Sequence, residues 1–94
     1  ALESIFLAFA NNLSAIALAA VSIPSNIAEG FARVGSKDYC HFLSIAKGSV
    51  YEVDTQLRIA VMLGFLTEEQ SAVTMSLCAE CGRMLNSMIT KLSV

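Results

Sequence analysis

Apolar and small residues recur at helical spacing over the middle of the chain. Between residues 36 and 66 they recur mostly every three or four positions, at Phe42, Leu43, Ala46, Ser49, Val50, Val53, Leu57, Ala60, Val61 and Leu63. A stripe of this length predicts an amphipathic helix, because strands are shorter and alternate with a period of two. No segment shows that alternation, and no residue pair is typical of a hairpin turn. The sequence therefore predicts an all-α fold.

Local signals predict where the last two helices begin. Ser36 is expected to be an N-cap, with Asp38 in the first turn, where the helix dipole favours a negative charge. The helix is expected to close at residues 64–66. Thr67 and Gln70 match a capping box, which predicts a further helix. The apolar stripe of that helix comprises Val73, Leu77, Cys81, Met84, Leu85, Met88 and Leu92.

The first third of the chain predicts two more helices. Residues 2–10 predict a short one, the pair Asn11-Asn12 predicts a turn, and residues 13–34 predict a second helix that stops at Gly35. Four helices with short connections predict an up-and-down antiparallel four-helix bundle, formed by one domain over residues 1–94. The first helix is short for that role, so the alternative that residues are absent near Asn11 or at the N-terminus stays open.

Pro24 lies inside the second predicted helix and cannot donate a hydrogen bond to the carbonyl of Ala20. In one interpretation the helix continues through a kink, and Ser22 or Ser25 satisfies the freed backbone groups. In the other the chain breaks, and Asn26 caps a new helix. Apolar spacing continues across the proline, which favours a proline-kinked second helix.

The composition predicts self-association. Hydrophobic residues make up 55% of the chain and charged residues only 15%, whereas about 25% is usual in soluble domains. A single domain of 94 residues has a modest core, so part of this apolar surface is expected to meet another copy. The net charge of −2 gives no general electrostatic reason to bind nucleic acid.

Insertion into a membrane is the alternative explanation for the apolar surface. Residues 4–28 carry no charge, but asparagines, serines and Pro24 interrupt the run. Its cleanest piece, residues 13–23, is shorter than the ~20 residues that a span needs. We therefore expect no membrane span, and no secretory signal is evident. Three cysteines without a targeting signal are typical of a reducing cytoplasm.

The cysteines and the single histidine predict no catalytic, metal or cofactor site. Cys78 and Cys81 form one C-x-x-C pair, whereas a metal site needs a second pair or spaced histidines. Both are expected to be buried thiols within a helix. Cys40 and His41 are adjacent on a helix, so they do not face each other as a nucleophile and a base would. The expected function is therefore non-enzymatic.

Polar residues of two neighbouring helices are expected to gather near the middle of the bundle. The expected members of this structural polar cluster are Ser22, Pro24, Asn26, Glu29, Ser49 and Glu52, with Lys47 beside them. These groups are expected to bond one another and the backbone freed at the proline, since buried polar groups require partners. A ligand site at Glu29 and Glu52 is the alternative. The small Gly48-Ser49 step is expected to allow close helix approach.

Two segments carry a family resemblance. AAVSIPSNIAEGFAR (residues 19–33) and KDYCHFLSIAKGSVYEVDTQLRIA (residues 37–60) resemble the 23S rRNA intervening-sequence protein family. The family pattern is a Ser-Ile-Pro-x-Asn-Ile-Ala-Glu-Gly core, then a long helix with a Gly-Ser pair, a Glu three residues after that Ser, and a Leu-Gly ending. Residues 22–30, Gly48-Ser49, Glu52 and Leu63-Gly64 match it.

The resemblance implies a four-helix bundle, a ring of five copies and no catalytic activity. It also implies kinship with the accessory variability proteins of diversity-generating retroelements, whose members bind nucleic acid. Candidate contacts to RNA or DNA are Arg33, Lys37, Lys47 and Arg58. One departure weakens this carry-over: basic residues common in the family are replaced by Ala17 and Leu18, and phosphate neutralisation dominates nucleic-acid affinity.

Overall fold

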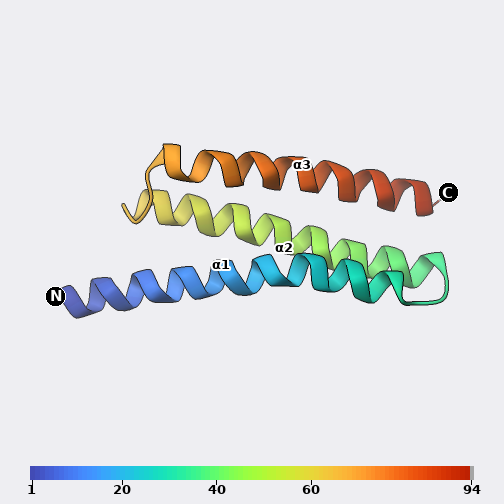
Figure 1. Cartoon of the computed structure of the whole chain (residues 1–94), viewed down its shortest axis with the longest axis horizontal. Helices are drawn as coiled ribbons and strands as arrows, with labels where there is room; N and C mark the ends of the chain where they lie inside the picture. Colours follow the sequence, from blue (N-terminus) through green and yellow to red (C-terminus); the bar gives the residue numbers. More distant parts are fainter. Residues whose placement is uncertain (94) are drawn as a thin grey trace.

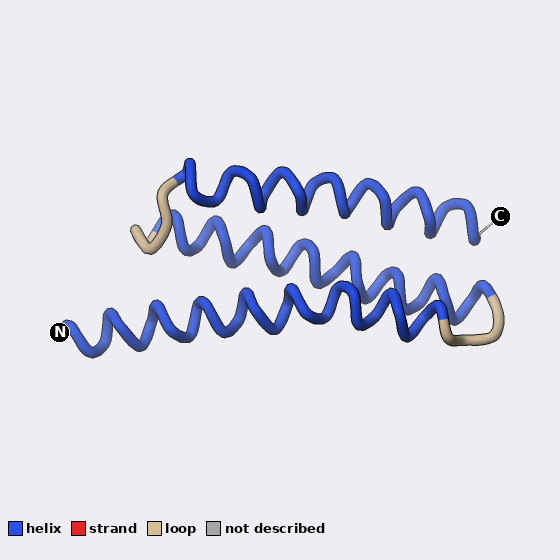
Figure 2. Tube along the Cα trace, in the orientation of Figure 1, coloured by secondary structure: helices blue, strands red, loops and turns tan. Residues whose placement is uncertain are grey.

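The computed structural model describes residues 1–93 and shows three helices joined by two short turns (Figures 1 and 2). Helix α1 spans Leu2–Phe31, α2 spans Ser36–Met62 and α3 spans Glu68–Leu92. No strand occurs within the described residues. The all-helical prediction is confirmed, whereas the prediction of four helices is wrong.

The missing helix boundary is at Asn11-Asn12, where the predicted turn does not form. Asn12 is only 8% exposed, and its Nδ2 donates to the side-chain oxygen of Gln56 at 3.2 Å and to its carbonyl at 3.4 Å. An amide favours turns because it competes for local backbone groups. Here that amide is bonded to α2 instead, so residues 2–31 form one uninterrupted helix.

Pro24 lies within this same helix. The alternative in which the chain breaks and Asn26 becomes a cap is therefore wrong. The Ser25 hydroxyl donates to the Val21 carbonyl at 2.8 Å, and the Asn26 amide donates to the Ser22 carbonyl at 2.8 Å. These side chains support the backbone around the proline, as Ser and Asn can do in a helix interior. The kink itself stays a prediction.

The turn between α1 and α2 differs by a few residues from expectation. Helix α1 ends at Phe31, with Ala32 as its C-cap. Gly35, expected as a helix stop, instead holds the N-cap position of α2 with φ 105°, and Ser36 is the first helical residue. A positive φ of this kind is easily reached only by glycine, so Gly35 displaces Ser36 from the predicted cap.

The turn between α2 and α3 follows the predicted signals. Gly64 has φ 79°, its N–H donates to the Val61 carbonyl, and the Phe65 N–H donates to the Ala60 carbonyl. This pair of bonds is a Schellman motif, which ends the helix. The Gln70 N–H then donates to the Thr67 hydroxyl at 3.1 Å and the Thr67 N–H donates to the Gln70 side chain at 2.9 Å. The capping box is confirmed.

Helix α2 is the central element, and both other helices pack against it (Figure 1). Ser49 bonds to Ser22 of α1, whereas Val50 lines a surface together with Met75 and Cys78 of α3. Neighbouring helical residues point about 100° apart. Helices α1 and α3 therefore pack on different sides of α2, and within the described residues they do not pack on each other.

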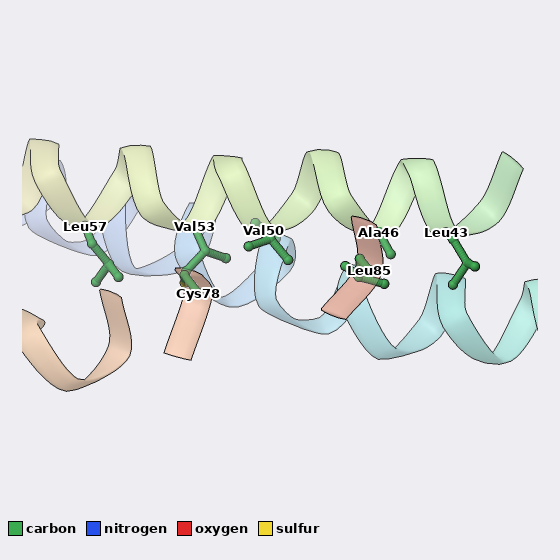
Figure 3. Packing of buried hydrophobic residues seen from close by; sticks show 8 residues of the cluster. Leu43, Ala46, Val50, Val53, Leu57, Cys78 and Leu85 are labelled. Carbon is green, nitrogen blue, oxygen red and sulfur yellow. The ribbon is translucent and has the colours of Figure 1, made fainter. Parts of the chain in front are cut away.

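The core follows the inner face of α2 (Figure 3). In that view Leu85 lies beside Ala46, and Cys78 lies beside Val53. The buried apolar side chains are Ala19, Leu43, Ala46, Val50, Val53, Leu57, Ala60, Cys78 and Leu85. The stripe predicted for α2 is thus largely buried. The stripe predicted for α3 divides: Leu85 is buried, whereas Leu77 is 58% and Met84 60% exposed.

Candidate functional site

The polar cluster contains three of the six predicted residues. Asn26 Nδ2 donates to Ser22 Oγ at 2.9 Å, and Ser22 Oγ lies 2.7 Å from Ser49 Oγ. The Ser49 hydroxyl also lies 3.3 Å from the Ile45 carbonyl. A hydroxyl has one proton to donate. If Ser49 donates to Ile45, Ser22 donates to Ser49, and the chain of bonds runs in one direction from α1 to α2.

This chain of bonds uses the cluster's polar groups internally. No buried side-chain nitrogen or oxygen among the described residues lacks a partner. A ligand site needs polar groups that stay open toward the ligand. The arrangement of Ser22, Asn26 and Ser49 is that of an interhelical structural contact, which fixes the register of α1 on α2.

The other three predicted members lie outside the cluster. Pro24 is exposed on α1. Glu29 is exposed and pairs with Arg33 one turn later. Glu52 is exposed on α2. Since Ser49 is level with Ser22, Glu52 is level with about residue 19, so Glu29 is ~15 Å away along the bundle at 1.5 Å per residue. The structure does not bring Glu29 and Glu52 together.

Close helix approach occurs at Gly30 rather than at Gly48. A Cβ on Gly30 would lie 2.8 Å from the Cβ of Phe42 and 3.0 Å from the ring of Tyr39. Gly48 has nothing within 4 Å of such an atom. Gly30 is therefore required by packing of α1 on α2. Of the predicted Gly48-Ser49 step, Ser49 is buried and bonds to Ser22 of α1, whereas Gly48 faces open space.

The sequence reasoning missed the contact between Asn12 and Gln56. Asn12 and Asn26 are fourteen residues apart, which is two heptads, so both lie on the side of α1 that faces α2. This spacing is the signal that could have found the contact. Asn12 bonds directly to α2, whereas Asn26 bonds to Ser22, whose hydroxyl reaches Ser49 of α2.

Most of the candidate nucleic-acid contacts are engaged by other side chains of the same chain. Arg33 pairs with Glu29 and lies over the Phe42 ring at 5.0 Å. Arg58 pairs with Asp54 at 2.9 Å. Lys47 lies 5.8 Å from the centre of the Tyr51 ring. Lys37 has no ion-pair partner within residues 1–93. Three of these four cations thus already have partners in their own chain.

All three cysteines are free thiols. Burial raises the pKa of the Cys78 thiol above its usual value of 9.0, and the nearby Asp54 carboxylate and Cys81 add to the rise. A thiol held protonated is a poor nucleophile and a poor metal ligand. His41 is exposed and stacks edge-on against Phe42. Within residues 1–93 no group of three potential metal ligands is assembled.

Among residues 1–93, one helix meets the length and composition criteria for crossing a membrane. It is α1, whose most apolar stretch is only 11% buried in the bundle. Core helices of soluble proteins can pass the same test. In this structure the polar side chains of Asn12 and Ser22 on this helix bond to α2.

Comparison with models of known protein families gives a match. A family model described as 23S rRNA-intervening sequence protein matches residues 12–87, a range that includes the polar cluster, Gly30 and most of all three helices. No curated protein and no solved structure matches the chain. Because the match covers about four fifths of its length, this chain belongs to the 23S rRNA-intervening sequence protein family.

Proposed function

We propose that this protein is a non-enzymatic, homo-oligomeric helical bundle protein of the cytoplasm. The observation that carries the proposal is the apolar surface left open on α1 and α3. Leu13 is 47% exposed, and Leu77 and Met84 are more so. Soluble monomers rarely expose contiguous apolar patches of this kind. Free cysteines support a reducing compartment.

The placement of the reactive side chains supports a non-enzymatic role. Glu29 is neutralised by Arg33 and lies far from Glu52, and the Cys78 thiol is buried. Catalytic groups need to converge on one accessible point within hydrogen-bond reach of a substrate. The polar residues that do converge, Ser22, Asn26 and Ser49, bond one another instead.

Light scattering of the purified chain at micromolar concentration tests the proposal. The expected result is a mass that is a multiple of 10.0 kDa. The family resemblance implies five copies. A stable species of 10.0 kDa across the concentration range would contradict self-association, whatever its symmetry.

Binding of structured RNA or DNA is the second candidate function. Arg33 and Lys37 flank the turn between α1 and α2, so an oligomer would repeat both residues around one end. The kinship with retroelement accessory proteins that the resemblance implies also supports this alternative. The pairing of Arg33 with Glu29 and the net charge of −2 weigh against it.

A salt-titrated mobility-shift assay tests this alternative. If Lys37 contacts phosphate, Lys37→Ala should reduce the slope of log affinity against log salt by ~0.7–0.9. Lys91→Ala, a lysine of the last turn of α3, is the matched control and should leave the slope unchanged. RNA that migrates as free RNA at low salt would contradict nucleic-acid binding.

A further inference from the structure

The first two turns of α1 carry an exposed apolar surface, which we call the α1 tip (residues 2–9). Four large apolar side chains of the tip are more than half exposed: Leu2, Ile5, Phe6 and Leu7. Phe9 completes the tip and packs edge-on against Phe65, with the ring centres 5.3 Å apart. The family match begins only at residue 12, so the α1 tip lies outside the part of the chain that the family model describes.

The α1 tip protrudes from one end of the bundle. Asn12 is level with Gln56 of α2, since their side chains bond. Helix α2 ends at Met62, six residues after Gln56, so its end is level with about residue 6 of α1. Residues 2–5 therefore extend ~6 Å beyond α2 at 1.5 Å per residue. Figure 1 shows α1 reaching past the turn that joins α2 to α3.

The α1 tip is apolar on opposite sides of the helix. Ile5 and Leu7 are two residues apart, so their side chains point in nearly opposite directions, and both are more than half exposed. A groove on another protein covers one face of a helix, whereas lipid can surround a helix end. Helix α1 also meets the composition criterion for a membrane helix. The tip therefore matches a lipid environment better than a protein groove.

We propose that the α1 tip inserts into the surface of a phospholipid bilayer and attaches the protein to it. Helices at a membrane interface bury their apolar side chains ~5–10 Å deep, a depth that the overhang of α1 can reach. The contact goes beyond the proposed self-association and does not use Leu13, Leu77 or Met84, which carry that proposal.

Insertion of the α1 tip leaves the bundle intact. Within residues 1–93, Asn12 is the first residue of α1 whose side chain bonds to α2. The tip precedes it, so no side-chain bond between the helices breaks when the tip enters lipid. A span by the whole of α1 would break the bonds of Asn12 and Ser22 to α2, which is costly in hydrocarbon. The contact is therefore one with the membrane surface, and the expectation of no membrane span is retained.

Acidic residues at this end of the molecule select the kind of lipid. Glu3 lies in the α1 tip, and Glu68 and Glu69 begin α3 at the same end of the bundle (Figure 1). Within residues 1–93 none of the three forms an ion pair. The negative surface potential of anionic lipids repels such an end, so zwitterionic lipid is the better match. Glu3 also limits the depth of insertion, because a carboxylate in hydrocarbon is costly.

The position of the α1 tip is compatible with self-association. The tip lies at one end of the long axis of the bundle (Figure 1), so copies that associate through the sides of their bundles leave it free. In a ring of parallel copies every tip would lie at the same end, and several weak contacts with one surface act together. The proposed lipid contact therefore holds for any number of parallel copies.

Tryptophan fluorescence tests the proposal in the full chain, which has no tryptophan of its own. Phe6→Trp places the probe on the α1 tip. Phe31→Trp is the matched control, since Phe31 is similarly exposed at the other end of α1. Phosphatidylcholine vesicles should shift the emission of Phe6→Trp to shorter wavelength, and brominated phosphatidylcholine should quench it. The emission of Phe31→Trp should stay unchanged.

Flotation with the same vesicles measures the strength of the contact. Phe6→Ser should lower the partition coefficient by about tenfold or more, because one large apolar side chain no longer leaves water. Phe31→Ser should bind as the parent does. Glu3→Gln should bind more tightly than the parent, and vesicles that contain equal parts of phosphatidylglycerol should bind the parent less.

Three results would overturn the lipid contact. The first is a parent chain that does not float with phosphatidylcholine vesicles, and the second is an equal loss of binding in Phe6→Ser and Phe31→Ser. The third is emission of Phe6→Trp that is at short wavelength without lipid and moves to longer wavelength on dilution, since a second copy would then cover the α1 tip. Light scattering measures self-association separately, so either proposal can fail while the other stands.

Discussion

The two surfaces by which α2 holds its neighbours differ in chemistry. Toward α1 the contact includes the amide of Asn12, which bonds to Gln56, and the hydroxyl of Ser22, which bonds to Ser49. Toward α3 it consists mainly of apolar side chains such as Leu85 and Cys78 (Figure 3). Apolar packing contributes free energy without direction. Hydrogen bonds between helices contribute less but select one register.

The difference between the two contacts follows from the residue patterns of α1 and α3. Helix α1 is apolar on several sides, so apolar burial alone would allow it to rotate or slide on α2. Its polar contacts are placed where they prevent this. Helix α3 carries charged residues on its outer face, such as Glu80 and Arg83, and its apolar positions already define how it packs. The comparison teaches that polar residues in α1 determine orientation, whereas apolar residues in α3 determine stability.

The largest expected effect is on the α2–α3 contact. Leu85 is almost fully buried, so Leu85→Ala should lower the free energy of unfolding by about 2–5 kcal/mol. Leu77→Ala, two turns earlier on the same helix but exposed, should cost under about 0.5 kcal/mol in dilute, dissociated protein. Urea denaturation of both variants provides the measurement. Equal losses would mean that Leu77 is covered within a single chain.

The next effect concerns the approach of α1 to α2. Gly30→Ala introduces a Cβ 2.8 Å from that of Phe42, and overpacking of this kind costs about 1–3 kcal/mol. Gly48→Ala is the matched control, since Gly48 lies in a helix and has open space around it. It should raise stability by about 0.5–1 kcal/mol. The midpoint of thermal unfolding should therefore fall for Gly30→Ala and rise for Gly48→Ala. Shifts of the same sign would contradict the close contact between Gly30 and Phe42.

A smaller effect is expected from the amide contact between α1 and α2. Asn12→Ala should cost about 1 kcal/mol, as is usual for one hydrogen bond. In a chain that already carries Asn12→Ala, adding Gln56→Ala should cause no further loss of stability, because the two side chains share one contact. A double-mutant cycle by chemical denaturation measures the coupling, expected at about 0.5–1.5 kcal/mol. Strictly additive losses would show that the amides do not act together.

The sequence predicted the parts of the fold that depend on neighbouring residues. The capping box at Thr67, the end of α2 near Gly64 and the buried stripe through Leu43 and Leu57 all follow from local spacing, and all are confirmed. The turn at Asn11-Asn12 was predicted by the same local logic and is wrong. The partner that satisfies Asn12 is Gln56, 44 residues away, and local patterns do not reveal such distant contacts.

At the candidate site, too, one part of the prediction is confirmed and another part is wrong. Ser22, Asn26 and Ser49 meet because two antiparallel helices place them level with each other, and the predicted pairing of helices was enough to suggest it. Glu29 was grouped with them by spacing along one helix. Its side chain instead pairs with Arg33, a partner of opposite charge one turn later on the same helix.

The smallest expected effect is a pH dependence from the α2–α3 contact. Burial raises the pKa of Cys78 above 9.0, so the folded state holds its proton more tightly than the unfolded chain does. The contribution to stability is fully present below pH 9.0 and is lost as pH rises above it. Denaturation of the parent and of Cys78→Ala at pH 7.5 and at about pH 10 isolates this group, since other titrating residues are common to both. The gap in stability between parent and variant should narrow at the higher pH, and a gap that widens would contradict a raised pKa.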